Sequence, residues 1–231
     1  MPTLADFPIS TKWPAKSPDA IQLYSFPTPN GVKISIALEE MGLPYEAHKI
    51  NLSGDTTTPE FLSLNPNNKI PAIIDPNGPD GEPLGLFESA AILIYLAEKS
   101  GQLIGNTPAQ KFKVIQWLTF QIGGIGPMFG QLGYFHKFAG SEIEDPRPVE
   151  RFVVESQRLL NVVDQQLEGK DWITGDYSIA DIAIAPWLNG LEFYGAQEVV
   201  GWHGFKNAVA YRDRFYDRPA VQRAKNIPPR D

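Results

Sequence analysis

The chain contains no cysteine among its 231 residues. It can therefore form no disulfide, hold no thiolate-bound metal and offer no cysteine nucleophile of its own. Any sulfur chemistry would have to use the thiol of a bound molecule. Histidines are also few, and the three present, His48, His136 and His203, show no metal-ligand spacing, so we expect no metal site.

Long apolar runs and an excess of basic residues are missing as well. No apolar stretch approaches the roughly 20 residues that cross a bilayer, and the N-terminal segment lacks the charged start and apolar middle of a signal peptide. The formal net charge is -7, whereas a nucleic-acid surface needs clustered Lys and Arg. These absences predict a cytoplasmic globular protein that binds neither membranes nor nucleic acids. Its 42% hydrophobic content supports a real core.

The first half of the chain has the pattern of a mixed α/β domain. IQLYSF at 21–26 and YEAHKINL at 45–52 are typical of strands, and the apolar spacing between Val32 and Met41 predicts a helix between them. The remaining predicted elements are a proline-initiated helix at 59–62, strands within 69–75 and 83–88, and a helix at 89–100. Together they give the order β-α-β-α-β-β-α.

The second half has only helical periodicity. Helices are predicted at 109–121, 148–167, 179–189 and 205–217. Ser178 and Asp181 fit a capping box, with aspartate in place of glutamate. The loss of strand signals near residue 105 marks a domain boundary. The predicted organisation is an extended, proline-rich N-terminal arm at 1–19, an α/β domain at 20–104 and an all-helical domain at 108–231.

Three motifs in this order resemble those of the cytosolic glutathione transferases. NNKIPAI at 67–73 resembles the family's cis-proline segment, FESAAI at 87–92 its glutathione-carboxylate segment, and YSIADIA at 177–183 its helical-domain capping motif. With PTPNG at 27–31 and GGIGPMFGQ at 123–131, the pattern is similar to the Nu class of bacteria and to fungal relatives of the yeast nitrogen-regulator prion protein. The resemblance implies a thioredoxin-like N-terminal domain followed by a helical C-terminal domain, glutathione as substrate and a homodimer.

The turn PTPNG is the candidate site for activating the glutathione thiol. Amides and the positive dipole end of the helix that follows Asn30 favour a thiolate. Thr28 can donate its hydroxyl and Asn30 an amide hydrogen to the sulfur, and the resemblance implies that both are catalytic. From spacing alone, the alternative is that Asn30 only caps the helix and Thr28 fills a loop. Tyr24 and Ser25 are rivals, because other classes of the family use tyrosine or serine.

Two further segments have residues that the resemblance assigns to glutathione. A cis Ile70–Pro71 bond would leave the backbone of Ile70 to pair with the cysteinyl part of glutathione, whereas a trans proline would be an ordinary strand start. Glu88 suits the γ-glutamyl ammonium, and Ser89 with the first helical amides suits a carboxylate. A simple N-cap is the alternative for Ser89.

Three more binding residues and a pocket complete the implied site. Asn68 and Lys69 can contact the glycyl carboxylate. Arg151 matches an arginine that reaches glutathione in the Nu class, although a helix-surface salt bridge is an alternative for it. The aromatic and methionine side chains at 128–135 are expected to line the second-substrate pocket or, alternatively, to belong to the core.

The missing cysteine also shapes the expected reaction. Without an enzyme thiol, glutathione must exchange directly with its substrate, which predicts a disulfide reductase or peroxidase holding up to two glutathiones per site. Conjugation of electrophiles is a possible second activity. The alternatives are a regulatory or ligand-holding relative, against which the short, Asn-poor arm counts, and an isomerase, for which PTPNG lacks the serine-rich turn.

Overall fold

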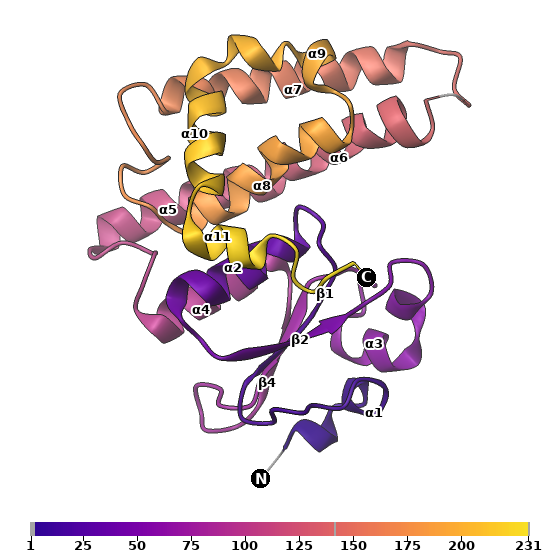
Figure 1. Ribbon diagram of the computed structural model, residues 1–231, viewed down its shortest axis with the longest axis vertical. Coiled ribbons are helices and arrows are strands. Elements are labelled where there is room, and N and C mark those ends of the chain that lie inside the picture. The colour runs from indigo at the N-terminus through magenta and orange to yellow at the C-terminus, as the bar shows by residue number, and fades with distance from the viewer. Residues whose placement is uncertain (1–2, 141, 231) are drawn as a thin grey trace. The chain divides into compact units, whose positions relative to one another are not determined.

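The computed structural model describes residues 3–140 and 142–230 of the chain. They form two compact units, which are described separately (Figure 1). The first unit comprises Met1–Gly101 together with Pro219–Asp231, and the second comprises Gln102–Arg218. In the described ranges, no helix has the length and apolar character needed to cross a membrane.

A four-stranded mixed sheet forms the centre of the first unit. The strands lie in the order β2-β1-β3-β4, with β1 parallel to β2 and antiparallel to β3, and β3 antiparallel to β4. Their bounds are Ile21–Ser25 for β1, Tyr45–Lys49 for β2, Ala72–Asp75 for β3 and Leu84–Phe87 for β4. Every residue of β1 is buried. The predicted thioredoxin-like arrangement is confirmed.

Three helices accompany the sheet, and their ends follow from local chemistry. They are α2 (Gly31–Met41), α3 (Pro59–Leu64) and α4 (Ser89–Ser100), and a short 3-10 turn, η2 (Asp55–Thr57), precedes α3. Gly42 and Gly101 end α2 and α4 at φ 65° and 68°, a left-handed conformation that glycine adopts without a steric penalty. Helix α2 packs against α4. The N-termini of these two helices bear the predicted site residues Thr28, Asn30, Glu88 and Ser89.

The prediction of an extended N-terminal arm is wrong. Residues 4–6 form a 3-10 turn, η1 (Leu4–Asp6), and a one-turn helix, α1 (Ile9–Lys12), follows. Ile9 is 0% exposed and belongs to a core cluster with Tyr24 and Phe61. Leu4, Phe7 and Trp13 pack against the same cluster. The prolines hid the helical signal, but burial of these apolar side chains orders the segment.

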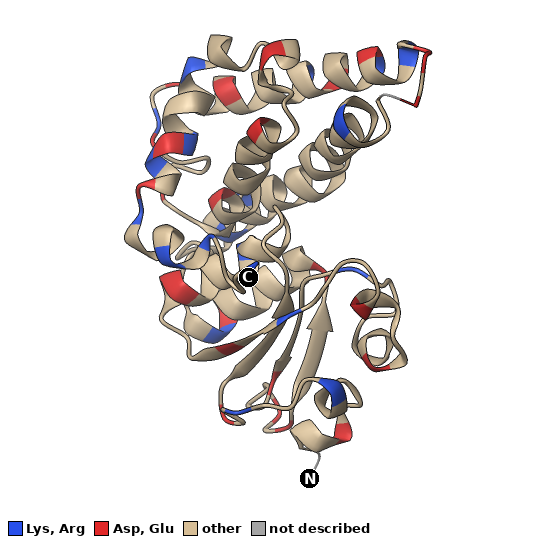
Figure 2. Cartoon of the chain, turned by 45° about the vertical axis from the view of Figure 1, so that its right-hand side comes forward, with Lys and Arg blue, Asp and Glu red and all other residues tan. Residues whose placement is uncertain are grey.

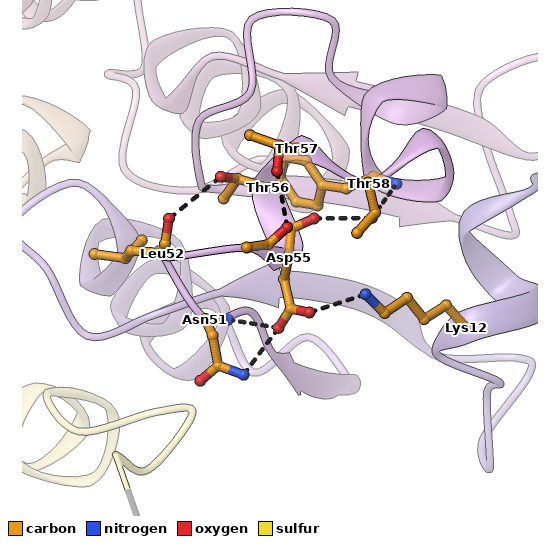
Figure 3. A network of polar contacts seen from close by, with 9 residues as sticks. Lys12, Asn51, Leu52, Asp55, Thr56, Thr57 and Thr58 are labelled. Carbon is orange, nitrogen blue, oxygen red and sulfur yellow. Dashed lines mark hydrogen bonds and ion pairs between the residues drawn. The ribbon is translucent and has the colours of Figure 1, made fainter.

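Polar contacts join this N-terminal segment to strand β2 and to the loop between β2 and α3. The Asp55 carboxylate accepts hydrogen bonds from Lys12 Nζ and from the backbone N–H and side-chain amide of Asn51, each at 2.9 Å (Figure 3). The backbone N–H groups of Lys16 and Ser17 donate to the Glu46 carboxylate at 2.8 and 2.7 Å. The segment is therefore attached by both apolar and polar contacts.

The C-terminal segment also departs from the predicted domain bounds. Helix α11 (Pro219–Ala224) packs against α2 and belongs to the first unit instead of the helical one. Ser35 Oγ donates to the Ala224 carbonyl at 3.0 Å. Ala220 and Val221 are buried in this packing. The helical unit therefore ends at Arg218, because the last helix buries its apolar side against α2.

The second unit is helical throughout the part that the structure describes. Its elements are α5 (Pro108–Phe120), a π-helical turn η3 (Gln121–Ile125), α6 (Gly126–Gly133), a second π-helical turn η4 (Tyr134–Phe138), α7 (Arg147–Gln166), α8 (Ile179–Phe193), α9 (Gln197–Val200), η5 (Trp202–Gly204) and α10 (Lys206–Tyr216). The four predicted helices correspond to α5, α7, α8 and α10. Acidic and basic residues alternate along α7 (Figure 2).

The glycine-rich stretch at 123–130 continues the helical backbone. Backbone hydrogen bonding continues from α5 into α6 through the π turn η3. A Cβ on Gly126 would lie 2.7 Å from Gln121 Nε2, and one on Gly133 would lie 2.5 Å from the Tyr194 ring. These glycines therefore permit close side-chain approach to a continuous helix.

The predicted capping box at the start of α8 is confirmed. Asp181 is fully buried, and its carboxylate accepts from the backbone N–H groups of Ser178 and Ile173, both at 2.9 Å. The Ser178 oxygen accepts from the Ala180 N–H at 3.3 Å. These bonds satisfy buried donors, so Asp181 has the folding role that its position in the motif indicates.

Candidate functional site

The turn between β1 and α2 holds Thr28 at the first amides of the helix. The Thr28 N–H donates to the Phe26 carbonyl at 2.7 Å, and the Thr28 carbonyl accepts from the Val32 N–H at 3.0 Å. Its Oγ1 accepts from the Gly31 N–H at 3.2 Å. A hydroxyl that accepts in this way still has one hydrogen to donate. Thr28 therefore both completes the turn and presents a donor at the helix N-terminus.

Asn30 occupies the N-cap position of α2 and is half-buried. Its side chain makes no capping hydrogen bond to the helix. One alternative for Asn30 was that its side chain only caps the helix. The hydrogen bond to the first helical amide is instead made by Thr28. Both side chains therefore lie at the positive end of the helix dipole, as the thiolate hypothesis requires.

Gly31 allows the helix to start directly against the end of β1. A Cβ at this position would lie 1.9 Å from the Phe26 carbonyl oxygen and 2.7 Å from Ser25 Oγ. No side chain fits there without moving the backbone. The close approach also buries the Ser25 hydroxyl completely. This position of Ser25 counts against contact with a ligand.

Tyr24 is a core residue, which counts against a role in activating the thiol. It is 1% exposed and stacks on His48 with ring centroids 4.8 Å apart. Burial, offset by a hydrogen bond with Ser10, raises the pKa of Tyr24 to about 12. The phenol is therefore neutral at physiological pH and unsuited to activate a thiol as a base.

We expect Tyr24→Phe to leave glutathione-dependent turnover within about threefold of the wild type, because the ring keeps its packing and no reacting group is lost. The measurement is kcat/KM for glutathione-dependent disulfide reduction. A loss of about tenfold or more, the scale of removing a positioned donor, would show that the Tyr24 hydroxyl takes part in the reaction.

The segment before β3 is organised by a buried asparagine. The Asn65 side chain donates to the Lys69 carbonyl at 2.5 Å and accepts from the Asn67 N–H at 2.9 Å. Asn68 has a φ of 50°, and the Ile70–Pro71 bond is cis as expected. Asn68 and Lys69 are exposed on this loop. Asn65 was not predicted, although an asparagine directly after a helix and before Pro-Asn-Asn is a recognisable turn signal.

Glu88 and Ser89 lie at the start of α4, as predicted. Glu88 has φ 69° and ψ 114°, a conformation that non-glycine residues rarely adopt and that clusters at functional sites. Its carbonyl accepts from the Ile92 N–H at 3.0 Å, which makes it the first acceptor of the helix. Glu88 is exposed, and Ser89 is buried beside it.

A buried lysine next to Ser89 was missed in the sequence. Lys33 is 0% exposed in the first turn of α2, and its Nζ lies 3.4 Å from Ser89 Oγ. Burial lowers the pKa of Lys33 to about 7, and the Glu88 carboxylate opposes this shift. The available signal was a single charged residue in the run Val32–Leu38, whose only other polar residue is Ser35. Lys33 connects the N-termini of α2 and α4.

A second missed residue, Arg230, reaches the Pro27–Gly31 turn from the C-terminal segment. Its Nη2 donates to the Pro27 carbonyl at 3.1 Å, and its guanidinium carbon lies 5.9 Å from the centre of the Phe26 ring. Lys49 Nζ donates to the Arg230 carbonyl. These contacts brace the turn that carries Thr28 and Asn30, and no sequence signal joins residues so far apart.

Arg151 belongs to the helical unit and not to the unit that holds the other site residues. It is exposed on α7. The Arg158 guanidinium, and to a smaller extent the charge of Arg151, lower the pKa of Glu155. The contact of Arg151 with glutathione stays a prediction.

The aromatic residues expected at the second-substrate pocket divide into two groups. Phe129 is fully buried, so it belongs to the core of the helical unit. Tyr134 is 52% exposed and contacts Phe135, which stacks on Phe152 with ring centroids 5.5 Å apart. The exposed part of this cluster is what can meet a ligand.

Comparison with protein families identifies the class that this fold and site define. Residues 28–99 match the model of the glutathione S-transferase N-terminal domain, and residues 129–219 match that of the C-terminal domain. The chain belongs to the glutathione S-transferase family.

Individual relatives are similar over nearly the whole chain. The disulfide-bond oxidoreductase YfcG of Escherichia coli is 45% identical over 214 residues, covering 88% of this chain and 94% of that protein. A glutathione transferase from Burkholderia graminis, solved with two glutathione molecules per subunit, is 61% identical with a TM-score of 0.98, covering 100% and 98% of the two chains. One from Pseudomonas putida, solved with one glutathione disulfide per subunit, is 60% identical with a TM-score of 0.96, covering 98% and 99%.

Proposed function

We propose that this protein is a glutathione-dependent disulfide reductase in which bound glutathione supplies the thiolate. The observation that carries the proposal is the start of α2, where the Thr28 hydroxyl and the Asn30 amide lie at a positive helix end in a chain without cysteine. Hydrogen bonds to a thiolate lower the pKa of the thiol without a neighbouring cation. The disulfide-bond oxidoreductase relative supports the same reaction.

The reaction balances with two glutathiones and no enzyme thiol. The first thiolate attacks one sulfur of the substrate disulfide, forming a mixed disulfide and releasing a substrate thiolate that takes up a proton. A second glutathione thiolate then attacks the mixed disulfide, which yields glutathione disulfide and the second substrate thiol. The Burkholderia relative, solved with two glutathiones, holds the two thiols that this reaction consumes. The Pseudomonas relative, solved with glutathione disulfide, holds its product.

Glutathione is proposed to lie along the edge formed by the two site segments of the first unit. The Ile70 backbone before Pro71 pairs with the cysteinyl part, strand-fashion. Glu88 binds the γ-glutamyl ammonium, and Ser89 with the first amides of α4 binds the adjacent carboxylate.

The remaining proposed contacts are with the glycyl carboxylate and with the second substrate. Asn68 and Lys69, both exposed, suit the glycyl carboxylate. Arg151 adds a guanidinium for a carboxylate group. Peroxides and small electrophiles are proposed as further substrates, because a glutathione thiolate also attacks oxygen and carbon centres.

Turnover with three second substrates tests the proposal. With glutathione fixed, we expect the highest kcat/KM with hydroxyethyl disulfide, lower values with a peroxide and the lowest with an aryl halide. Faster conjugation of the aryl halide would make the protein a conjugating transferase. No turnover with any of the three would favour a regulatory or ligand-holding role.

Within the family we propose the Nu class, on the strength of the PTPNG, NNKIPAI and GGIGPMFGQ segments. We also propose a homodimer, which the resemblance to the glutathione transferases implies. A cytoplasmic location is proposed because the reaction consumes reduced glutathione, which the cytosolic redox poise maintains.

A further inference from the structure

We propose that Lys33 is a positioning residue for the γ-glutamyl carboxylate of glutathione, acting through the Ser89 hydroxyl. This inference rests on the proposed function, because it names a residue that prepares the same site. Lys33 does not touch the reacting sulfur. It fixes the direction in which Ser89 donates its hydrogen.

The geometry joins the two helix ends of the site. Lys33 lies three residues after Asn30 and is fully buried, and its Nζ is 3.4 Å from the oxygen of Ser89, the first residue of α4. Helices α2 and α4 pack against each other. The lysine therefore links the turn that is proposed to hold the thiolate with the helix start that is proposed to hold the carboxylate.

Hydrogen-bond chemistry gives this contact a direction. In its ammonium form Lys33 can only donate, so the Ser89 oxygen is then the acceptor in their bond. The one hydroxyl hydrogen of Ser89 is then directed away from the lysine, and a carboxylate at the start of α4 is a suitable acceptor for it. Without the ammonium, the hydroxyl could rotate and donate elsewhere.

Electrostatics makes this an unusual place for a cation. Burying a charge is unfavourable unless partners compensate, and the N-termini of both α2 and α4 carry partial positive charge. The Glu88 carboxylate offsets part of this repulsion. A ligand carboxylate at the start of α4 would offset more, so the arrangement favours an anion at this position.

If Lys33 only packed the core, its loss would affect all ligands equally. Comparing two ligands therefore distinguishes a packing role from a positioning role. Glutathione has the γ-glutamyl group, and cysteinylglycine is the same thiol without it. With Lys33→Met, which keeps the length of the side chain and removes the charge, we expect binding of glutathione to weaken by about tenfold, the scale of one charge-assisted hydrogen bond. Binding of cysteinylglycine should stay within about twofold, since the lost contact served the missing group.

The matched control is Lys99→Met at the other end of α4, where Lys99 Nζ pairs with Asp75 at 2.8 Å. It removes a lysine from the same helix region, and we expect it to change the affinity of neither ligand. Dissociation constants come from calorimetry for glutathione and from competition with glutathione for cysteinylglycine. Equal weakening of both ligands in Lys33→Met, or no change in either, would overturn the proposal.

Ser89→Ala completes a double-mutant cycle. If Lys33 acts through Ser89, then Lys33→Met should add less than about twofold to the loss already caused by Ser89→Ala. Fully additive losses would contradict this route. Should Lys33→Met not fold, Lys33→Leu also removes the donor and the charge and decides the same comparison. Failure of the wild type to bind glutathione would instead reject the proposed function itself.

Discussion

Gly31→Ala is expected to reduce glutathione-dependent disulfide reduction by about 100-fold, the scale of misplacing a catalytic group by about 1 Å. The added Cβ would lie 1.9 Å from the Phe26 carbonyl oxygen, a backbone atom that cannot rotate away. Either β1 or α2 must move, and Thr28 and Asn30 move with them. Overpacking of this kind also destabilises the fold, by about 1–3 kcal/mol.

Two measurements separate these effects. Urea unfolding gives the loss of stability, and kcat/KM under conditions where the variant is folded gives the loss of positioning. Gly204→Ala is the control, because an added Cβ there meets nothing within 4 Å. We expect that variant to keep its stability within about 0.5 kcal/mol and its full activity. A folded Gly31→Ala protein with wild-type turnover would show that the close approach of turn and strand is not needed for catalysis.

Asn30→Ala is expected to lower the rate of disulfide reduction by about tenfold or more, since it removes one positioned donor from a developing or resident negative charge. The pKa of the bound glutathione thiol should rise in this variant, because fewer hydrogen bonds then stabilise the thiolate. Titration of the thiolate absorbance in the enzyme–glutathione complex measures that pKa directly. Asn30→Asp should reduce the rate further, because a carboxylate repels the thiolate.

The control for Asn30 is Asn106→Ala, an exposed asparagine of the helical unit for which wild-type turnover is expected. Unchanged turnover and an unchanged thiol pKa in Asn30→Ala would remove Asn30 from the mechanism. Thr28 would then be the side chain to test next, with Thr28→Val, which removes the hydroxyl and keeps the shape.

Local chemistry made much of the first unit predictable. PTPNG places a glycine and a polar pair at the start of a helix, and turn residues act through their own φ and hydrogen bonds over a few positions. The capping box at Ser178 was predicted for similar reasons, whereas the cis bond before Pro71 was implied by the resemblance to the glutathione transferases. The succession of strands and helices was predicted from periodicity, whereas the thioredoxin-like sheet was implied by the resemblance.

The N-terminal segment shows where local signals mislead. Its prolines and lack of periodicity indicated an extended arm, yet Ile9 lies in a core cluster and Lys12 pairs with Asp55. Its short helical turns are stabilised by apolar contacts with another part of the unit, which a local pattern does not contain. The same holds for α11, whose place in the first unit depends on its packing against α2.

The sequence by itself determined the thioredoxin-like order of elements, the need for a borrowed thiol and the turn where Thr28 and Asn30 meet a helix end. Only the tertiary structure decided that Tyr24 is core, that Gly31 is confined by the Phe26 carbonyl, and that Lys33 reaches Ser89, 56 residues further along the chain. The physical reason is the distance along the chain over which each interaction acts. Turns and caps form from neighbouring residues, whereas burial, pKa and side-chain contacts between helices depend on which distant segments pack together.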